Sequence, residues 1–139
     1  MPLICDCPSM DTDVVVVGGG SAGLQAALTL GRMRLAVVVV DAGEPSNAPA
    51  HAIGGLLGGH ELSPLELLET GRAQLAELPS VRLVDGEVTH VGADRTATLA
   101  NGSSIAARAV VLATGCDYGL PDVPGIADLW GTSVIHCPF

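Results

Sequence analysis

Apolar residues in this chain fall into short runs separated by turns rich in glycine and proline, which is the pattern of an α/β protein with a buried sheet. The runs Asp13 to Val17 and Leu35 to Val40 consist mainly of valine, as is typical of parallel strands covered on both faces. The segment between them, Ala22 to Met33, has only a narrow polar stripe at helical spacing, formed by Gln25, Thr29 and Arg32. The pattern predicts a strand, a helix and a second parallel strand.

The turn between the first strand and the helix has the spacing G-x-G-x-x-G at Gly18, Gly20 and Gly23. In such a turn the first glycine permits the tight bend, the second lets a pyrophosphate approach the backbone, and the third lets the helix pack against the strand. Asp41 ends the second strand about 20 residues further on, where a carboxylate bonds the adenosine ribose. An accidental glycine turn is the alternative, but the strand, helix and carboxylate in register favour a dinucleotide site.

A long loop and a second helix follow. The loop, residues 42–60, contains Asn47 and His51, which could contact a ligand or could simply serve a turn and the surface. Ser63, Pro64 and Glu66 then form a helix start with a capping box, and Pro79 closes this segment. We expect this helix to be scaffold.

The next segments are short strands. Their expected ranges are Val81 to Asp85, Glu87 to Val91, Thr96 to Leu99 and Ser104 to Ala107, with a hairpin turn at Asn101 and Gly102. Their close spacing predicts a small antiparallel meander. Ala109 to Gly115 is apolar and predicts a buried parallel strand that ends at Thr114 and Gly115, the end of a strand where ligands bind in doubly wound sheets. A structural turn is the alternative at that corner.

Composition narrows the class of partner. The chain has 139 residues, 48% of them hydrophobic but only 2% aromatic, so its core must consist of Val, Leu, Ile and Ala. The net charge is −9, and all basic residues are arginine, which argues against nucleic acid or an anionic membrane as a partner. No apolar run is long enough to span a bilayer, and residues 1–12 lack the features of a secretory signal, so we expect a cytoplasmic protein.

The cysteines do not predict a metal site. Cys5, Cys7, Cys116 and Cys137 match neither the spacing of zinc ligands nor that of a small disulfide framework. Cys5 and Cys7 lie in a proline-flanked tail, and Cys116 is expected to be a packed side chain.

In this order the motifs resemble the first part of a thioredoxin-reductase-like flavoprotein. The resemblance rests on GGGSAG, the carboxylate ending the second strand, a three-stranded meander, VVLATG, the LPDVPG crossing segment and WGTSVIHCPF. It implies a Rossmann-like, doubly wound domain that binds FAD, a second domain that binds NADPH, and a redox-active Cys-x-x-Cys in that second domain. The HCPF ending is also similar to dithiol oxidases that close disulfides in small natural products.

The resemblance implies roles for individual residues. Pyrophosphate contacts are implied at Gly18, Gly20, Ser21, Ala22 and Gly23, and a ribose contact at Asp41. Asn47 would lie near the flavin-side loop, Val88 near adenine through its backbone, and Thr114 and Gly115 beside the cofactor. Cys137 matches the first cysteine of the redox pair and would be the thiol that exchanges with substrate.

Three regions follow from this reading. Residues 1–11 would be a disordered tail, residues 12–116 the N-terminal part of the FAD domain, and residues 117–139 a crossing segment and the start of the NADPH domain. The second cysteine would be residue 140, and the NADPH fingerprint is absent. We therefore expect an N-terminal fragment with an incomplete sheet, itself inactive because one thiol cannot form an intramolecular disulfide.

For the intact protein the resemblance implies hydride transfer from NADPH to FAD, passage of two electrons to the cysteine pair, and exchange with a thioredoxin, another protein disulfide or a small dithiol. A dithiol oxidase would run the last steps in reverse, with oxygen as electron acceptor. Members of the family are usually homodimers. Two rivals stay open: a flavin monooxygenase or ferredoxin-reductase-like enzyme without redox cysteines, and a non-catalytic nucleotide-binding module.

Overall fold

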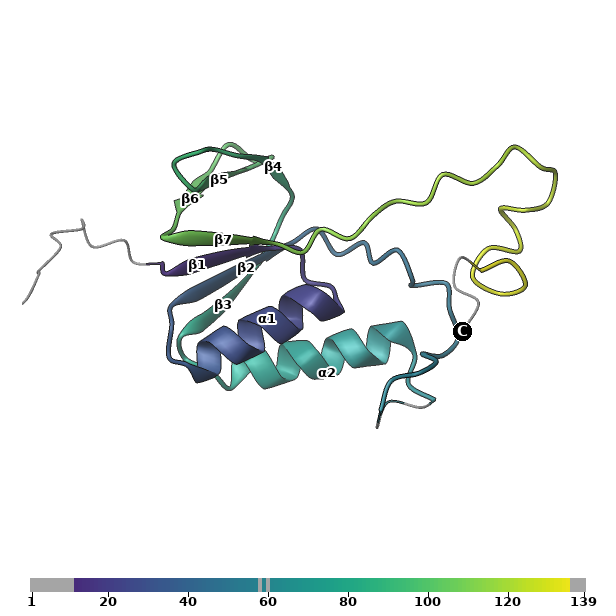
Figure 1. Cartoon of the computed structure of the whole chain (residues 1–139), viewed down its shortest axis with the longest axis horizontal. Coiled ribbons are helices and arrows are strands. Elements are labelled where there is room, and N and C mark those ends of the chain that lie inside the picture. Colours follow the sequence, from purple (N-terminus) through teal and green to yellow (C-terminus); the bar gives the residue numbers. More distant parts are fainter. Residues whose placement is uncertain (1–11, 58, 60, 136–139) are drawn as a thin grey trace, which may run out of the picture.

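Four parallel strands form the centre of the molecule, and their order is β3-β2-β1-β7. The computed structural model describes residues 12–57, 59 and 61–135. The strands are β1 (Val14–Val17), β2 (Val37–Asp41), β3 (Val81–Asp85) and β7 (Ala109–Leu112). Figure 1 shows them side by side with their carboxyl ends at one edge of the sheet. The predicted Rossmann-like parallel sheet is thus confirmed.

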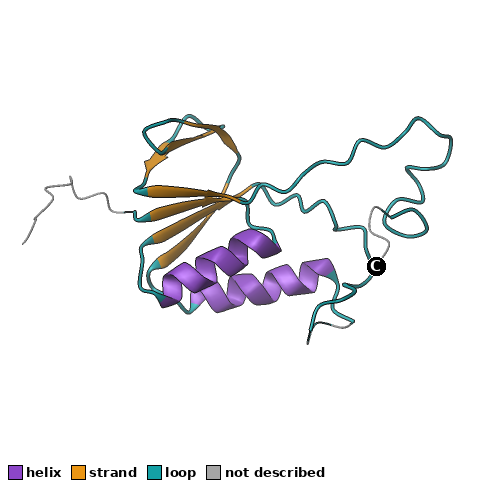
Figure 2. Ribbon diagram, in the orientation of Figure 1, coloured by secondary structure: helices purple, strands orange, loops and turns teal. Residues whose placement is uncertain are grey.

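Each face of this sheet is covered by a different layer. Helices α1 (Ser21–Arg32) and α2 (Pro64–Ala76) lie on one face. The other face carries an antiparallel sheet of β4 (Val88–Val91), β5 (Thr96–Leu99) and β6 (Ser104–Ala106), as Figure 2 shows. The result is a three-layer domain, in which the parallel sheet is the middle layer.

The valine runs follow from this arrangement. Alternate valines of β1 and β2 pack in two separate clusters: Val14, Val16, Val37 and Val39 against the helices, and Val15, Val17, Val38 and Val40 against the meander. All eight are at most 7% exposed. Because both faces of these strands are buried, the sequence is apolar at every position instead of alternating.

Several local predictions are confirmed. Helix α2 begins with a capping box: the Glu66 amide donates to Ser63 Oγ at 3.2 Å, and the Ser63 amide donates to Glu66 Oε2 at 2.8 Å. The turn between β5 and β6 contains Asn101, whose Oδ1 accepts a hydrogen bond from the Ser103 amide at 2.9 Å. Residues 42–57 form a loop without helix or strand.

Two predictions about strands are wrong. Val81–Asp85 does not belong to the meander but pairs in parallel with β2, because α2 supplies the crossover that a parallel connection needs. The strand at Ala109–Leu112 pairs in parallel with β1 as expected, yet it is not buried: it forms the edge of the sheet, and Leu112 is 68% exposed.

The segment after β7 extends away from the sheet without regular structure (Figure 1). Over residues 130–135 the chain forms no strand, and an isolated bridge joins Trp130 and Val134. Across the described residues, no helix has the length and apolar character required to cross a membrane.

Candidate functional site

The candidate site lies where the sheet changes its direction of winding. The chain passes from β1 through α1 to β2 on one side, whereas β7 pairs with β1 on the other side. In open α/β sheets the loops that leave two such strands diverge and open a crevice at their carboxyl ends. Here the diverging segments are the glycine turn after β1 and the Ala113 to Gly115 corner after β7.

The glycine turn has the geometry that its spacing predicts. Gly18 has a φ of 101°, and a Cβ at this position would collide with the carbonyl oxygen of Ala113. A Cβ on Gly23 would collide with the carbonyl of Gly18, so this third glycine permits the close approach of α1 to the turn. Both glycines are therefore required by the protein's own backbone.

Gly20 differs from these two positions. It is the N-cap of α1 and offers no side chain to the helix, and no protein atom lies within 4 Å of the point where its Cβ would project. The first amides of α1 have no acceptor within the helix, and the helix dipole adds partial positive charge there. This cradle can therefore accept an anionic group such as a pyrophosphate.

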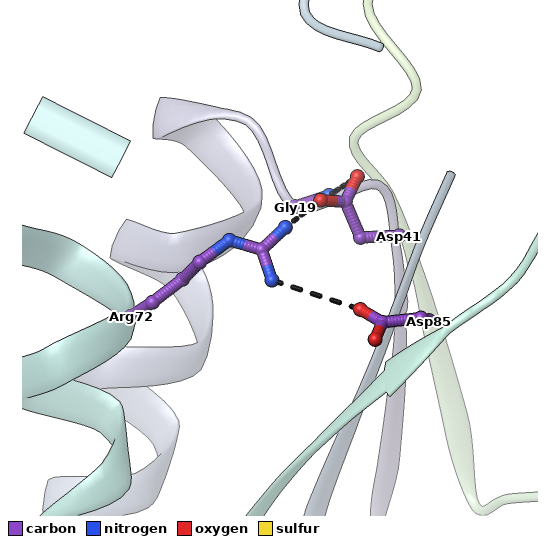
Figure 3. Close-up of polar contacts among 4 residues, drawn as sticks. All are labelled: Gly19, Asp41, Arg72 and Asp85. Atoms are coloured by element: carbon purple, nitrogen blue, oxygen red, sulfur yellow. Dashed lines mark hydrogen bonds and ion pairs between the residues drawn. The ribbon is translucent and has the colours of Figure 1, made fainter. Parts of the chain in front are cut away.

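Asp41 is held next to this cradle at the end of β2. Its Oδ1 accepts a hydrogen bond from the Gly19 amide at 2.9 Å, and a Cβ on Gly19 would overlap the Asp41 side chain. Its Oδ2 is paired with Nη2 of Arg72 from α2. Figure 3 shows Asp41 and Asp85 on the same side of the Arg72 guanidinium group, with Gly19 next to the Asp41 carboxylate.

The glycine turn, Asp41 and the Ala113 to Gly115 corner border one cavity of about 280 Å³. Its lining includes eight of the residues predicted to bind the cofactor: Gly18, Gly20, Ser21, Ala22, Asp41, Asn47, Thr114 and Gly115. Asn47 comes from the 42–57 loop, so that loop contributes to the site, whereas His51 is exposed and outside the lining.

Two predicted residues lie elsewhere, and a third is not among the described residues. Gly23 lies beneath the turn and acts through packing. Val88 is on β4, and its side chain packs against the meander-side cluster and not in the cavity lining, so its proposed backbone contact with adenine stays a prediction. Cys137 lies outside the described residues.

Sequence reasoning missed other residues at the site. Gly19 occupies a variable position of the G-x-G-x-x-G pattern, yet it carries the amide that binds Asp41. Cys116 is exposed and lines the cavity instead of being packed. Arg72 belongs to a helix that we had interpreted as scaffold. A third glycine between Gly18 and Gly20 is a signal from which Gly19 could be predicted, but nothing in the local sequence singles out Arg72.

A larger hollow of about 410 Å³ lies between α1 and α2. Leucines such as Leu24, Leu28 and Leu68 line much of it, and no charged side chain among the described residues does. A dinucleotide needs donors for its phosphates, so the smaller cavity at the glycine turn is the better candidate despite its size.

The fold is that of a Rossmann-like α/β domain, and this cavity is its candidate dinucleotide site. Residues 12–138 match the sequence profile described as pyridine nucleotide-disulphide oxidoreductase. The chain belongs to that family.

Individual relatives agree with this assignment. A thioredoxin reductase of Claviceps purpurea is 34% identical over 132 residues, which are 90% of this chain and 41% of the relative. A ferredoxin–NADP reductase of Granulibacter bethesdensis is 33% identical over 86% of this chain and 37% of the relative. The crystal structure of HlmI superposes with a TM-score of 0.86 at 43% identity, over 91% of this chain and 42% of that chain. The chain thus spans about two-fifths of the length of the relatives it matches.

Proposed function

We propose that this chain is the FAD-binding N-terminal part of a thioredoxin-reductase-like flavoprotein that moves electrons between NADPH, FAD and a Cys-x-x-Cys pair. The observation that carries the proposal is the open cradle at Gly20, with Asp41 fixed beside it at the switch point of the sheet. The names of the thioredoxin reductase relatives support the disulfide chemistry.

The described residues fit the adenosine and pyrophosphate end of such a cofactor. The backbone of Gly20, Ser21 and Ala22 would bind the pyrophosphate, and the free lone pairs of Asp41 would accept hydrogen bonds from the ribose hydroxyls. Thr114 and Gly115 would border the cofactor from β7. FAD, when bound, supplies two-electron redox chemistry between a nicotinamide and a disulfide.

Further features of the whole protein are proposed on the resemblance. Cys137 would exchange with a thioredoxin-like protein or a small disulfide or dithiol, NADPH would bind in a second domain, and the full-length protein would be a cytoplasmic homodimer. The domain boundary near residue 116 is proposed on the same basis, since regular secondary structure ends with β7 at Leu112 in the described part of the chain.

The cradle is tested with Gly20→Ala. Its φ of −69° is accessible to alanine and no protein atom obstructs the methyl group, so the fold should be unchanged. ADP, which carries only the adenosine and pyrophosphate, is the first probe, followed by FAD. We expect binding of both to fall by about tenfold or more, because the methyl group occupies the space of the phosphate.

Gly119→Ala is the matched control, because a Cβ there also meets no protein atom within 4 Å and Gly119 is not in the cavity lining. Titrations followed by NMR would give the dissociation constants, and thermal melting would report the fold. Unchanged ADP and FAD binding in Gly20→Ala, or no binding by the unmodified chain, would overturn the proposal.

A ferredoxin–NADP reductase activity is the second candidate, favoured by the relative from Granulibacter bethesdensis. Cys137→Ser in the full-length parent separates the two. A disulfide reductase should lose NADPH-dependent reduction of a disulfide such as DTNB while retaining reduction of ferricyanide. An enzyme of the ferredoxin type should retain its activity in the same variant.

A further inference from the structure

We propose that Arg72 is a positioning residue that acts through Asp41 to select a ligand with ribose hydroxyls; this inference rests on the proposed function. Arg72 lies on α2, 31 residues from Asp41 in the sequence, and pairs with Oδ2 of the carboxylate, whereas the Gly19 amide donates to Oδ1. It is not part of the cavity lining. Arg72 therefore does not contact a ligand in the cavity directly, and Asp41 is the lining residue through which it can act on the position of a bound group.

The two contacts fix the carboxylate at both oxygens. Gly19 donates to Oδ1, and Arg72 donates to Oδ2, so rotation about the last side-chain bond would break both hydrogen bonds. Each oxygen retains lone pairs that can accept another donor. A carboxylate oriented in this way has less rotational freedom to lose when ribose hydroxyls bind to it.

The positive charge of Arg72 also balances the negative charge of the Asp41 carboxylate. Asp41 and Asp85 are register partners at the ends of β2 and β3, so two carboxylates lie at neighbouring strand ends. The Asp41 side chain is 15% exposed and is paired closely with Arg72, whereas Asp85 is 98% exposed and its Oδ1 is 4.0 Å from Arg72 Nη1. Because solvent screens an exposed pair, Asp41 is the effective partner of the guanidinium.

A purely structural role for Arg72 is less consistent with the packing. Helix α2 is already anchored by Leu75, which is 1% exposed, and by the contact of Gly71 with Leu24. A partly exposed ion pair adds little to a helix held in this way. The same ion pair has a large effect on the orientation of the one side chain that it contacts.

The test compares ADP with 2′,3′-dideoxy-ADP, which lacks both ribose hydroxyls. For Arg72→Gln we expect the dissociation constant of ADP to rise about tenfold, the effect of one hydrogen bond to a charged group. The constant for dideoxy-ADP should stay within about twofold of the unmodified chain, because that ligand gives Asp41 nothing to bind. Arg72→Lys should restore part of the ADP affinity, since it keeps the charge but not the planar geometry.

Arg108→Gln is the control variant. Arg108 also pairs with an aspartate, Asp13, at 3.2 Å, but this pair lies outside the cavity lining. The Arg108→Gln variant should bind ADP and dideoxy-ADP with the same dissociation constants as the unmodified chain. An equal loss for both nucleotides in Arg72→Gln would show a structural role, and no loss for either would show no role; each result overturns the inference while leaving the proposed cradle intact. Failure of the unmodified chain to bind ADP and FAD would instead overturn the proposed function itself.

Discussion

The two ends of the parallel sheet each contain an aspartate held by a backbone amide and an arginine, but in the described part of the chain only the aspartate at the carboxyl ends lines the cavity at the glycine turn. At the amino ends, Asp13 accepts from the Ala36 amide at 2.9 Å and from Arg108 at 3.2 Å. At the carboxyl ends, Asp41 accepts from the Gly19 amide and from Arg72.

The difference lies in what surrounds the carboxylate. Asp13 joins the start of β1 to the connection before β2 and borders no cavity described for the chain, so its bonds serve the fold. Asp41 lies beside a glycine turn whose amides have no helical partners, and it lines the cavity with unused lone pairs. An aspartate paired with an arginine therefore has a structural role at the amino ends of the strands and a proposed binding role at their carboxyl ends.

The largest effect on stability is expected from Leu75→Ala. This side chain is 1% exposed in the helix-side cluster, so its truncation should lower the free energy of unfolding by about 2–5 kcal/mol. The ADP affinity of the folded fraction should not change. Chemical denaturation measures the loss, and Leu65→Ala, at a position that is 49% exposed on the same helix, is the control. Equal losses in the two variants would contradict the assignment of the core.

Gly18→Ala should both destabilise the protein and abolish binding. A residue with a side chain at a φ of 101° costs about 1–3 kcal/mol, and the methyl group would also collide with the Ala113 carbonyl. Gly102→Ala shares the left-handed backbone, with a φ of 84°, but meets no atom within 4 Å. Denaturation and ADP titration should therefore show strain alone in Gly102→Ala. A similar stability for both variants would exclude the steric part of the argument.

Replacing each aspartate by alanine tests the comparison directly. Asp13→Ala leaves the Ala36 amide without its acceptor and should lower the unfolding free energy by about 1 kcal/mol without changing ADP affinity. Asp41→Ala likewise leaves the Gly19 amide without its acceptor, so we expect a similar loss of stability, but here together with an ADP dissociation constant raised about tenfold. If both variants lost only stability, the proposed difference between the two ends would disappear.

The smallest effect is expected at the start of α2. A backbone hydrogen bond from Ser63 lowers the pKa of Glu66 below its ordinary value of 4.5, and a side-chain hydrogen bond from Ser63 adds to it. The unfolded chain then binds more protons near this pH, so the contribution to stability is present above pH 4.5 and is lost as the pH falls through the lower folded pKa.

Ser63→Ala should lower the thermal midpoint at neutral pH by about 2–4 °C. Its midpoint should also fall less steeply than that of the unmodified chain between pH 5 and pH 3 (about the range of carboxyl titration). Glu66→Gln is the control that removes the titrating group. Because Ser63→Ala keeps the backbone amide that is the larger cause of the shift, Glu66→Gln should flatten the pH profile more than Ser63→Ala does. A profile of Glu66→Gln identical to that of the unmodified chain would argue against Glu66 as the source of the pH dependence.

Much of the fold could be predicted because its signals are local. The valine runs indicate strands covered on both faces, and Ser63, Pro64 and Glu66 mark a helix start through contacts within one turn. The glycine spacing predicts the backbone of the turn, since Gly18 and Gly23 are required by atoms in or next to the turn itself. The position of Asp41 at a strand end favours a place in the cavity, whereas for Asn47, Thr114 and Gly115 position alone leaves a structural turn open, and the family resemblance is what implied their places beside the cofactor.

What the sequence determined by itself is therefore the set of elements and the chemistry at their ends. Tertiary structure decided which elements are neighbours: β3 joined the parallel sheet, β7 became an exposed edge, and α2 brought Arg72 to Asp41. The physical reason is that periodicity and capping depend on residues within a turn or two. The meeting of Arg72 with Asp41, 31 residues apart, depends on how a whole helix packs on the sheet.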